Sequence, residues 1–235
     1  MTCGRTGAKN AGTRGLLGEV QFPWRESAAI ANLWDDVLHF VAEARVHMGR
    51  ETVLFRSDKY ELELLYEPLY TPGSADNVRS YSREYKLPNA ETRPSSRHGL
   101  ILRDGDTSAQ SCILLAGGGA TGIHEHSAVI LDDTCFVAVG DTLCSLALPS
   151  LDLLWHRQVD TATCFGVYYS AKHHCLISHG ELEIARLSLS GDVEWSSVGA
   201  DIFSEGFELH PDYIEAVDFN QAVYRMDIAT GASTK

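Results

Sequence analysis

Short apolar runs separated by polar turn residues fill the second half of the chain. Between residues 127 and 156 the apolar segments are four to seven residues long, and Asp132-Asp133, Gly140-Asp141 and Pro149-Ser150 stand between them. Segments of this length and composition predict β-strands, and the polar breaks predict turns. We expect strands at 98–103, 111–116, 127–131, 135–139, 142–148, 153–156, 167–170, 175–178, 182–189, 193–196, 207–209, 214–218 and 222–228.

Residue types in this region recur after forty positions. The residues that return are Cys135, Gly140, Asp152, Trp155 and Gly166, followed by Cys175, Gly180, Asp192, Trp195 and Gly206, and then Gly191, followed by Gly231. A period of this length corresponds to one repeated supersecondary unit, and four short strands per unit are typical of a β-propeller blade. Such units bury their apolar faces against each other, so the repeat predicts architecture and says little about chemistry.

These repeats resemble the blades of quinoprotein (pyrroloquinoline-quinone-type) β-propellers over about residues 126–235. In that family a glycine turn opens a strand, a second turn often carries a glycine, and a tryptophan packs between adjacent sheets. The matching residues are Gly140 and Gly180, Gly191 and Gly231, and Trp155 and Trp195. Leu151 departs from the pattern, because it stands where the second repeat has Gly191.

The number of repeats limits what this resemblance implies. About three clear copies are too few for a ring around an axial quinone, so we expect no cofactor. The last copy ends without its outermost strand and closing tryptophan. We therefore expect a mainly β protein, built as a small or incomplete propeller-like stack of four-stranded antiparallel sheets.

The first half of the chain has a different pattern. Residues 1–15 contain four glycines and predict a flexible tail. From Ser27 to Met48 apolar residues recur at helical spacing, and Gly49 follows, so we expect one N-terminal amphipathic helix. Residues 51–56 and 60–66 predict a hairpin, and 68–97 a long loop with a strand near 81–87. The predicted segments are thus 1–15, 16–97 and 98–235, packed as one compact domain.

Charge and cysteine content narrow the class of partner. The 32 acidic and 19 basic residues give a net charge of −13, which opposes binding to nucleic acid or an anionic membrane and favours a basic protein partner. The six cysteines form no Cys-x-x-Cys pair, and no apolar run is long enough for a signal peptide or a membrane span. We expect reduced thiols and a cytoplasmic protein.

Two short motifs suggest binding chemistry. Gly117, Gly119 and Gly122 match G-x-G-x-x-G, but a dinucleotide site needs a helix next, and the β-branched residues that follow favour a strand. His124 and His126 would face the same side of a strand and form a candidate metal pair, with His173, His174 and His179 as candidates to complete a site.

The long loop supplies another candidate site. Its basic and aromatic residues, Arg79, Tyr81, Arg83 and Tyr85, are candidate partner-binding residues, and the alternative is an ordinary linker. No Gly-x-Ser-x-Gly motif is present, and no acidic pair stands out, so we name no catalytic residue.

These observations favour a non-catalytic protein-binding module. Its acidic surface would bind a basic protein, as an inhibitor or immunity-type protein does. One alternative is a metal-binding or small-ligand-binding protein, or an enzyme, that uses the region of His124 and His126. A second alternative is a structural subunit that forms homo-oligomers through an open sheet edge.

Overall fold

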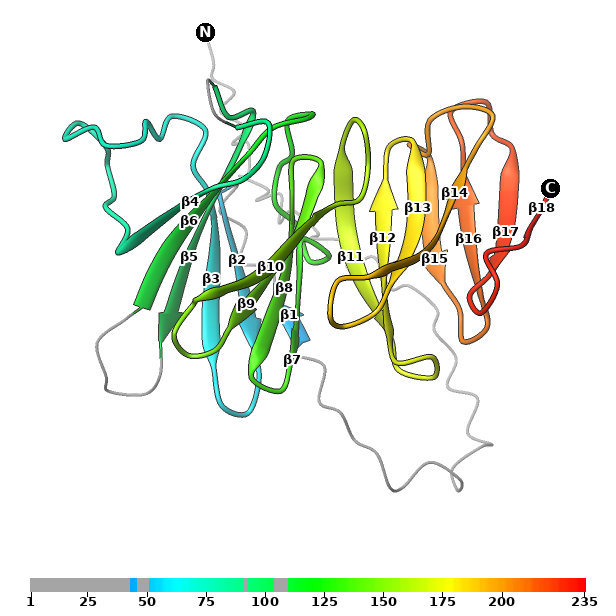
Figure 1. The fold of residues 1–235 in the computed structure, drawn as a ribbon, viewed down its shortest axis with the longest axis horizontal. Helices are drawn as coiled ribbons and strands as arrows, with labels where there is room; N and C mark the ends of the chain where they lie inside the picture. The colour runs from blue at the N-terminus through cyan, green and yellow to red at the C-terminus, as the bar shows by residue number, and fades with distance from the viewer. Residues whose placement is uncertain (1–42, 46–50, 91–92, 104–109) are drawn as a thin grey trace, which may run out of the picture. The chain divides into compact units, whose positions relative to one another are not determined.

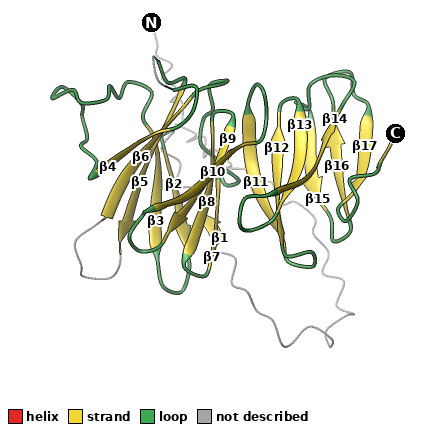
Figure 2. Cartoon of the chain, in the orientation of Figure 1, coloured by secondary structure: helices red, strands yellow, loops and turns green. Residues whose placement is uncertain are grey.

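The computed structural model describes residues 43–45, 51–90, 93–103 and 110–235. Every regular element in these residues is a β-strand, which confirms the prediction of a mainly β protein. The strands form four sheets (Figures 1 and 2). None of the described residues belongs to a helix long and apolar enough to cross a membrane.

The first sheet has six strands in the order β1-β2-β3-β5-β6-β4. Their bounds are β1 (Glu43–Arg45), β2 (Thr52–Arg56), β3 (Glu61–Tyr66), β4 (Arg83–Lys86), β5 (Ser96–Arg103) and β6 (Gln110–Ala116). All neighbours are antiparallel except β4, which runs parallel to β6. The hairpin predicted at 51–66 therefore lies inside a larger sheet, and the boundary predicted after residue 97 falls within β5.

The other three sheets are antiparallel meanders of four consecutive strands, as the forty-residue repeat predicts. The second sheet contains β7 (Ala128–Leu131), β8 (Thr134–Val139), β9 (Thr142–Ala147) and β10 (Leu153–Gln158). The third contains β11 (Cys164–Ser170), β12 (Cys175–Gly180), β13 (Glu183–Leu187) and β14 (Val193–Val198). The fourth contains β15 (Gly206–Leu209), β16 (Tyr213–Val217), β17 (Val223–Asp227) and β18 (Ser233–Thr234).

Two sequence predictions differ from this arrangement. The last repeat does have an outermost strand, because β18 pairs with β17 through Ser233 and Thr234. Glu43–Arg45, predicted as part of the helix, form β1 instead and pair with β2. Backbone pairing at a sheet edge outweighs the local helical pattern here. The rest of the predicted helix and the predicted tail lie outside the described residues.

The core lies between neighbouring sheets. Alternate residues of a strand point to opposite faces, so each inner sheet offers one apolar face to each neighbour. Buried residues that share a core cluster across the three successive interfaces include Leu64 with Val137, Phe136 with Val167, and Ile177 with Ile214. The sheets are thus packed face to face in chain order.

Tryptophans on the outer strands β10 and β14 close the two later interfaces. Trp155 Nε1 donates to the carbonyl of Leu189, at 3.1 Å, in the β13–β14 turn of the next sheet. The turn also brings Gly191 against the ring, where an added Cβ would stand 2.7 Å from Trp155. Trp195 and Gly231 repeat this contact at the next interface, with a corresponding distance of 2.8 Å.

The outward face of the first sheet is covered by the loop that contains β4. Tyr70 and Ala90 of this loop share a small buried cluster with Ile113 and Leu115 of β6, and Tyr81 packs against the cluster. The predicted long loop therefore packs on the outward face of the first sheet and covers apolar residues of β6.

The outward face of the fourth sheet is charged. Glu215 on β16 lies opposite Arg225 on β17, and the two side chains form an ion pair of 3.0 Å. The Arg225 guanidinium also stands 5.3 Å from the centre of the Tyr213 ring. Glu208 on β15 lies directly opposite Glu215 and is exposed. Polar outer faces of this kind are typical of the end units of stacked repeats.

Candidate functional site

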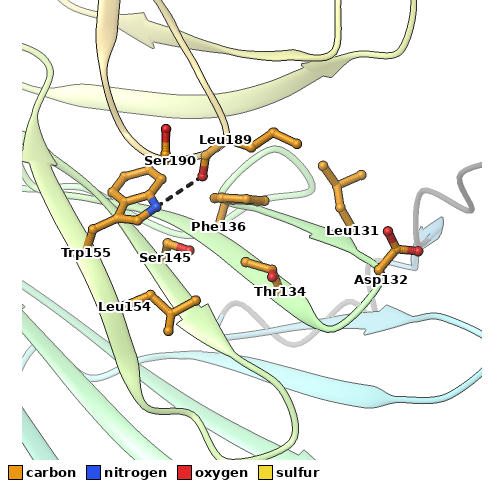
Figure 3. A pocket seen from close by; sticks show the side chains of 9 residues that line it. All are labelled: Leu131, Asp132, Thr134, Phe136, Ser145, Leu154, Trp155, Leu189 and Ser190. Carbon is orange, nitrogen blue, oxygen red and sulfur yellow. Dashed lines mark hydrogen bonds between the residues drawn. The ribbon is translucent and has the colours of Figure 1, made fainter.

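A pocket of about 340 Å³ lies beside Trp155, between the second and third sheets (Figure 3). Its apolar lining consists of Leu131, Phe136, Leu154, Trp155 and Leu189, and its polar lining of Asp132, Thr134, Ser145 and Ser190. Leu154 and Leu189 remain 57% and 40% exposed. Apolar walls with a few polar groups are typical of a binding pocket.

Three neighbouring strands build the floor and one wall of this pocket. Ser145 on β9 lies opposite both Phe136 on β8 and Trp155 on β10, so the three side chains share the face turned toward the third sheet. The two aromatic rings are 5.8 Å apart. Ser145 is fully buried, and its Oγ has no hydrogen-bond partner among the described residues. An unpaired buried hydroxyl costs about 1–3 kcal/mol, so stability alone does not explain this serine.

The next interface has an arginine at the position that matches Ser145. Arg186 on β13 is the cross-strand partner of Trp195, as Ser145 is of Trp155. Arg186 Nη1 donates to the carbonyl of Ile228 at 2.9 Å, and the same carbonyl accepts from Trp195 Nε1 at 2.9 Å.

A matching change accompanies this arginine on the outer strand. Glu194, which directly precedes Trp195, forms an ion pair of 2.5 Å with Arg186. The residue that precedes Trp155 is Leu154, which has no charge. The part of the pocket between Ser145 and Trp155 therefore corresponds to the position of the Arg186 side chain at the next interface.

The predicted histidine pair lies in the connection between β6 and β7, not on a strand. The His126 ring stacks on Tyr168 at 4.4 Å, Tyr168 contacts Phe207 at 4.4 Å, and Phe207 stacks on His179 at 4.5 Å. These rings form a row that begins in the β6–β7 connection and continues over β11 and β15 to β12. The structure thus brings His179 near the predicted histidine pair, and the residues between them are connected by aromatic stacking and not by a shared metal site.

Burial controls the protonation of this row. It lowers the pKa of His126, and it lowers the pKa of His179 to about 4. Burial also raises the pKa of Tyr168, and the nearby Glu125 carboxylate raises it further. The row is therefore neutral at pH 7.

Both ring nitrogens of His124 are engaged. Nε2 lies 2.8 Å from the carbonyl of Phe165, and Nδ1 accepts the backbone N–H of His126 at 3.2 Å. The part of the chain that the structure describes contains no cluster of three His, Cys, Asp or Glu side chains suited to a metal ion. Metal binding by His124 and His126 stays a prediction, and it would require His124 to give up one of these bonds.

Two of the predicted partner-binding residues join the first sheet to the second. Tyr85 Oη on β4 donates to the carbonyl of Leu151 at 2.9 Å, and Arg83 Nη1 donates to the carbonyl of Ser150. Trp155 contacts the corresponding turn of the next sheet in the same way. In the first sheet the aromatic ring that contacts the next sheet therefore comes from Tyr85 on β4. This strand runs parallel to its neighbour β6, whereas β10, which carries Trp155, runs antiparallel to β9.

The other two partner-binding candidates meet at one carboxylate. Arg79 Nη1 and Tyr81 Oη lie 3.0 Å and 2.7 Å from Glu67 Oε1. Burial raises the pKa of Tyr81 well above its usual value, and the hydrogen bond to Glu67 also raises it. All four candidates thus have contacts within the protein, and partner binding by them stays a prediction.

The glycine-rich motif supports packing between loops. Residues 117–127 form an irregular connection, without the helix that a dinucleotide site needs. Gly118 has a φ of +77°, and a Cβ there would stand 2.5 Å from the carbonyl of Ala162. The motif lets this connection lie close to the turns of the neighbouring sheets.

The described cysteines and His98 are buried and unreactive. The five cysteines are free thiols, and burial raises the pKa of Cys112 to about 12. Burial lowers the pKa of His98 to about 4, and its Nε2 lies 3.3 Å from the carbonyl of Thr121. A fully buried thiol or imidazole has no access to a substrate.

Aspartates collect at one end of the sheets, which we call the turn end. It consists of the first and third turns of each four-stranded sheet, which lie at the same end of a meander. Its aspartates are Asp132, Asp133, Asp152, Asp192, Asp212 and Asp227. Lys59 Nζ lies 3.0 Å from Asp133 Oδ1, and Lys172 Nζ lies 2.5 Å from Asp212 Oδ1. Each lysine lowers the pKa of the carboxyl group it contacts. The pocket beside Trp155 opens among these turns, because Asp132 and Ser190 line it.

Comparisons with known proteins give fold-level likeness only. No protein-family model and no curated protein match the chain. Among solved structures it is similar to the computationally designed Ika8 protein, with a TM-score of 0.44 and 10% identity over 77% of this chain and 59% of that chain. It is also similar to the WD40 beta propeller domain of Doa1 (TM-score 0.38, 10% identity, 83% and 53%) and to AztD from Citrobacter koseri (TM-score 0.41, 12% identity, 78% and 57%). The chain spans less than two thirds of each of these three structures.

Proposed function

We propose that this protein is a non-catalytic binding module that recognises a basic partner protein through its turn end. The observation that carries the proposal is the pocket beside Trp155, set among acidic turns and bordered by the exposed Leu154 and Leu189. A central aromatic and aliphatic anchor site with a charged rim is typical of protein recognition surfaces.

The charge of the chain supports the choice of partner. A net charge of −13 steers a basic protein toward the module and discourages nucleic acid. The proposed role is that of an inhibitor or immunity-type protein, which covers a basic enzyme without chemistry of its own. The free, buried thiols fit a reducing compartment, and we propose the cytoplasm.

Salt-dependent binding tests this proposal. The purified protein would be presented to basic proteins encoded by neighbouring genes, and affinity measured at about 50 and 300 mM salt, where the Debye length falls from about 14 to about 6 Å. We expect binding that weakens with salt and weakens further in the double variant Asp132→Asn/Asp192→Asn. Glu205→Gln serves as the control, because it removes an exposed charge directly before β15, at the opposite end of the fourth sheet. Binding that ignores both salt and the aspartate changes would refute the proposal.

A further inference from the structure

Ser145 brings an unpaired hydroxyl group to the floor of the pocket beside Trp155 (Figure 3). Its side chain lies between those of Phe136 and Trp155 on one row across the second sheet, and the two rings are 5.8 Å apart. The residue is fully buried, and its Oγ has no hydrogen-bond partner among the described residues. A serine hydroxyl can donate one hydrogen bond and accept two. A guest that fills the pocket can therefore pair with a group that the fold leaves unpaired.

The charges around this floor exclude a charged guest. Asp132 is the one charged residue among the described residues that line the pocket. It follows β7, whereas Trp155 lies on β10, at the opposite edge of the second sheet. An ionised group between Ser145 and Trp155 would lose its hydration without gaining a counter-charge, which is strongly unfavourable. The guest is therefore neutral.

The walls of the pocket favour an aromatic ring. Phe136 and Trp155 supply two rings, and Leu131, Leu154 and Leu189 supply aliphatic surface. An aromatic guest gains from offset or edge-to-face contacts with such rings, beyond the gain from burial alone. The volume of about 340 Å³ is at the lower end of the usual range for ligand pockets, so it suits one ring and not an extended segment.

Tyrosine is the neutral aromatic side chain that also matches the hydroxyl. Its phenol group both donates and accepts, as Ser145 does, whereas phenylalanine offers Oγ no partner and an indole N–H only donates. We infer that this pocket receives a tyrosine side chain of the partner protein, with its ring against Phe136 and Trp155 and its hydroxyl bonded to Ser145 Oγ. Tyrosine is common at the centre of protein interfaces. The inference rests on the proposed function, because it names the side chain that anchors the partner.

Titration with two compounds that differ by one hydroxyl tests the site directly. The compounds are N-acetyl-tyrosinamide and N-acetyl-phenylalaninamide, and the readout is the NMR signal of the Trp155 indole N–H, assigned by its loss in Trp155→Phe. We expect a saturable shift with the tyrosine compound, at a dissociation constant on the order of millimolar, because one side chain carries a small part of an interface. The phenylalanine compound should bind at least about three-fold more weakly. No shift, or equal affinities, would overturn the inference.

Ser145→Ala separates a binding role of this hydroxyl from a structural one. We expect the variant to bind both compounds equally, because the preference for tyrosine depends on Oγ. We also expect its midpoint of urea denaturation to rise, because the variant no longer buries an unpaired hydroxyl. A lower midpoint together with an unchanged preference for tyrosine would assign Ser145 to stability and overturn the inference.

Ser190→Ala is the matched control, since Ser190 lines the same pocket with a hydroxyl that is already bonded. Ser190 Oγ lies 2.8 Å from Ser188 Oγ and donates to Asp192 Oδ2 at 3.0 Å. We expect this variant to keep the preference for the tyrosine compound. Loss of the preference in Ser190→Ala and not in Ser145→Ala would overturn the assignment to Ser145.

The affinity for a protein partner distinguishes the two proposals. A partner identified by salt-dependent binding should bind Ser145→Ala at least about three-fold more weakly than wild type, with the same dependence on salt. Equal affinities would overturn the tyrosine anchor and leave the proposed function standing. Binding of the tyrosine compound without any salt-sensitive protein partner would overturn the proposed function while the phenol site itself stands.

Discussion

Gly191 and Gly231 are glycines for two reasons: each has a positive φ, and each lies against a tryptophan ring. Gly191 has a φ of +88°, a conformation that costs other residues about 1–2 kcal/mol, and it lies against the Trp155 ring. We expect Gly191→Ala to lower the free energy of unfolding by about 2–4 kcal/mol, since the added Cβ also pushes the ring away. Urea denaturation at pH 7 measures the loss.

Gly73 provides the matched control for this prediction. Its φ is +71°, but a Cβ at this position would meet nothing within 4 Å. Gly73→Ala should therefore show only the backbone cost, about 1 kcal/mol. Equal losses in the two variants would show that the contact with Trp155 does not matter.

The buried histidines make stability depend on pH. Burial lowers the pKa of His98 and of His179 to about 4, against about 6.5 in an unfolded chain. Between these values the unfolded chain binds more protons, so acid favours unfolding. We expect the full stability above about pH 6.5 and a progressive loss from pH 6.5 to 4, of up to about 3 kcal/mol for each histidine.

Urea denaturation from pH 7.5 to 4.5 measures this dependence. His98→Gln should reduce its slope even if the variant is less stable at every pH. His156→Gln, a change at an exposed side chain on β10, serves as the control. A slope that is the same in wild type and His98→Gln would rule out His98 as a source of the acid sensitivity.

At the scale of elements, β4 is the strand that no local pattern could place. Its residues alternate as a strand should, and the sequence predicts a strand near 81–87. Its parallel pairing with β6, however, depends on residues almost thirty positions away. The prediction that Arg83 and Tyr85 bind a partner followed from their place in a polar loop. In the fold both residues attach the first sheet to the second, and partner binding by them stays a prediction.

Substitution of Tyr85 separates the structural role from partner binding. Tyr85→Phe removes the hydrogen bonds of Oη with the Leu151 carbonyl and the Leu153 N–H, at 2.9 and 3.3 Å. We expect the free energy of unfolding to fall by about 1–2 kcal/mol, measured by urea denaturation. Unchanged stability together with loss of partner capture would instead favour the partner-binding interpretation.

The repeat itself could be predicted because its signals are local. Turn residues and short apolar runs place most strands of the last three sheets within one or two residues of their observed bounds. The pocket could not be predicted, because the forty-residue period aligns Ser145 with Ala185. Register shifts between the third and fourth strands of both sheets place Ser145 opposite Trp155 and Arg186 opposite Trp195.

At the scale of the whole described stack, the two outward faces differ from the faces between sheets. The loop that contains β4 covers one of them, and the charged side chains of Glu208, Glu215 and Arg225 occupy the other. Charged side chains on an outward face oppose face-to-face association, but they do not block pairing at a sheet edge. This arrangement disfavours self-assembly through the charged face, and self-assembly through an open sheet edge stays a prediction.

An apolar replacement of the charged face tests this interpretation. Glu215→Leu/Arg225→Leu would join the neighbouring Val217 and Val223 into an apolar surface on the fourth sheet. We expect sedimentation velocity to show concentration-dependent association of this variant and none of the wild type. Association of the wild type at micromolar concentration would support the self-assembling alternative instead.

The strand content, the forty-residue unit and the acidic character follow from the amino-acid sequence alone, because turn chemistry, strand periodicity and charge are properties of neighbouring residues. The closure of the first sheet, the positions of His124 and His126, and the interface that has a pocket are known only from the folded structure. These features depend on pairing between residues far apart in the chain and on a register shift that a fixed period conceals. The serine opposite Trp155 lines a pocket, whereas the arginine opposite Trp195 packs at the next interface, and this difference is visible only when the sheets are packed.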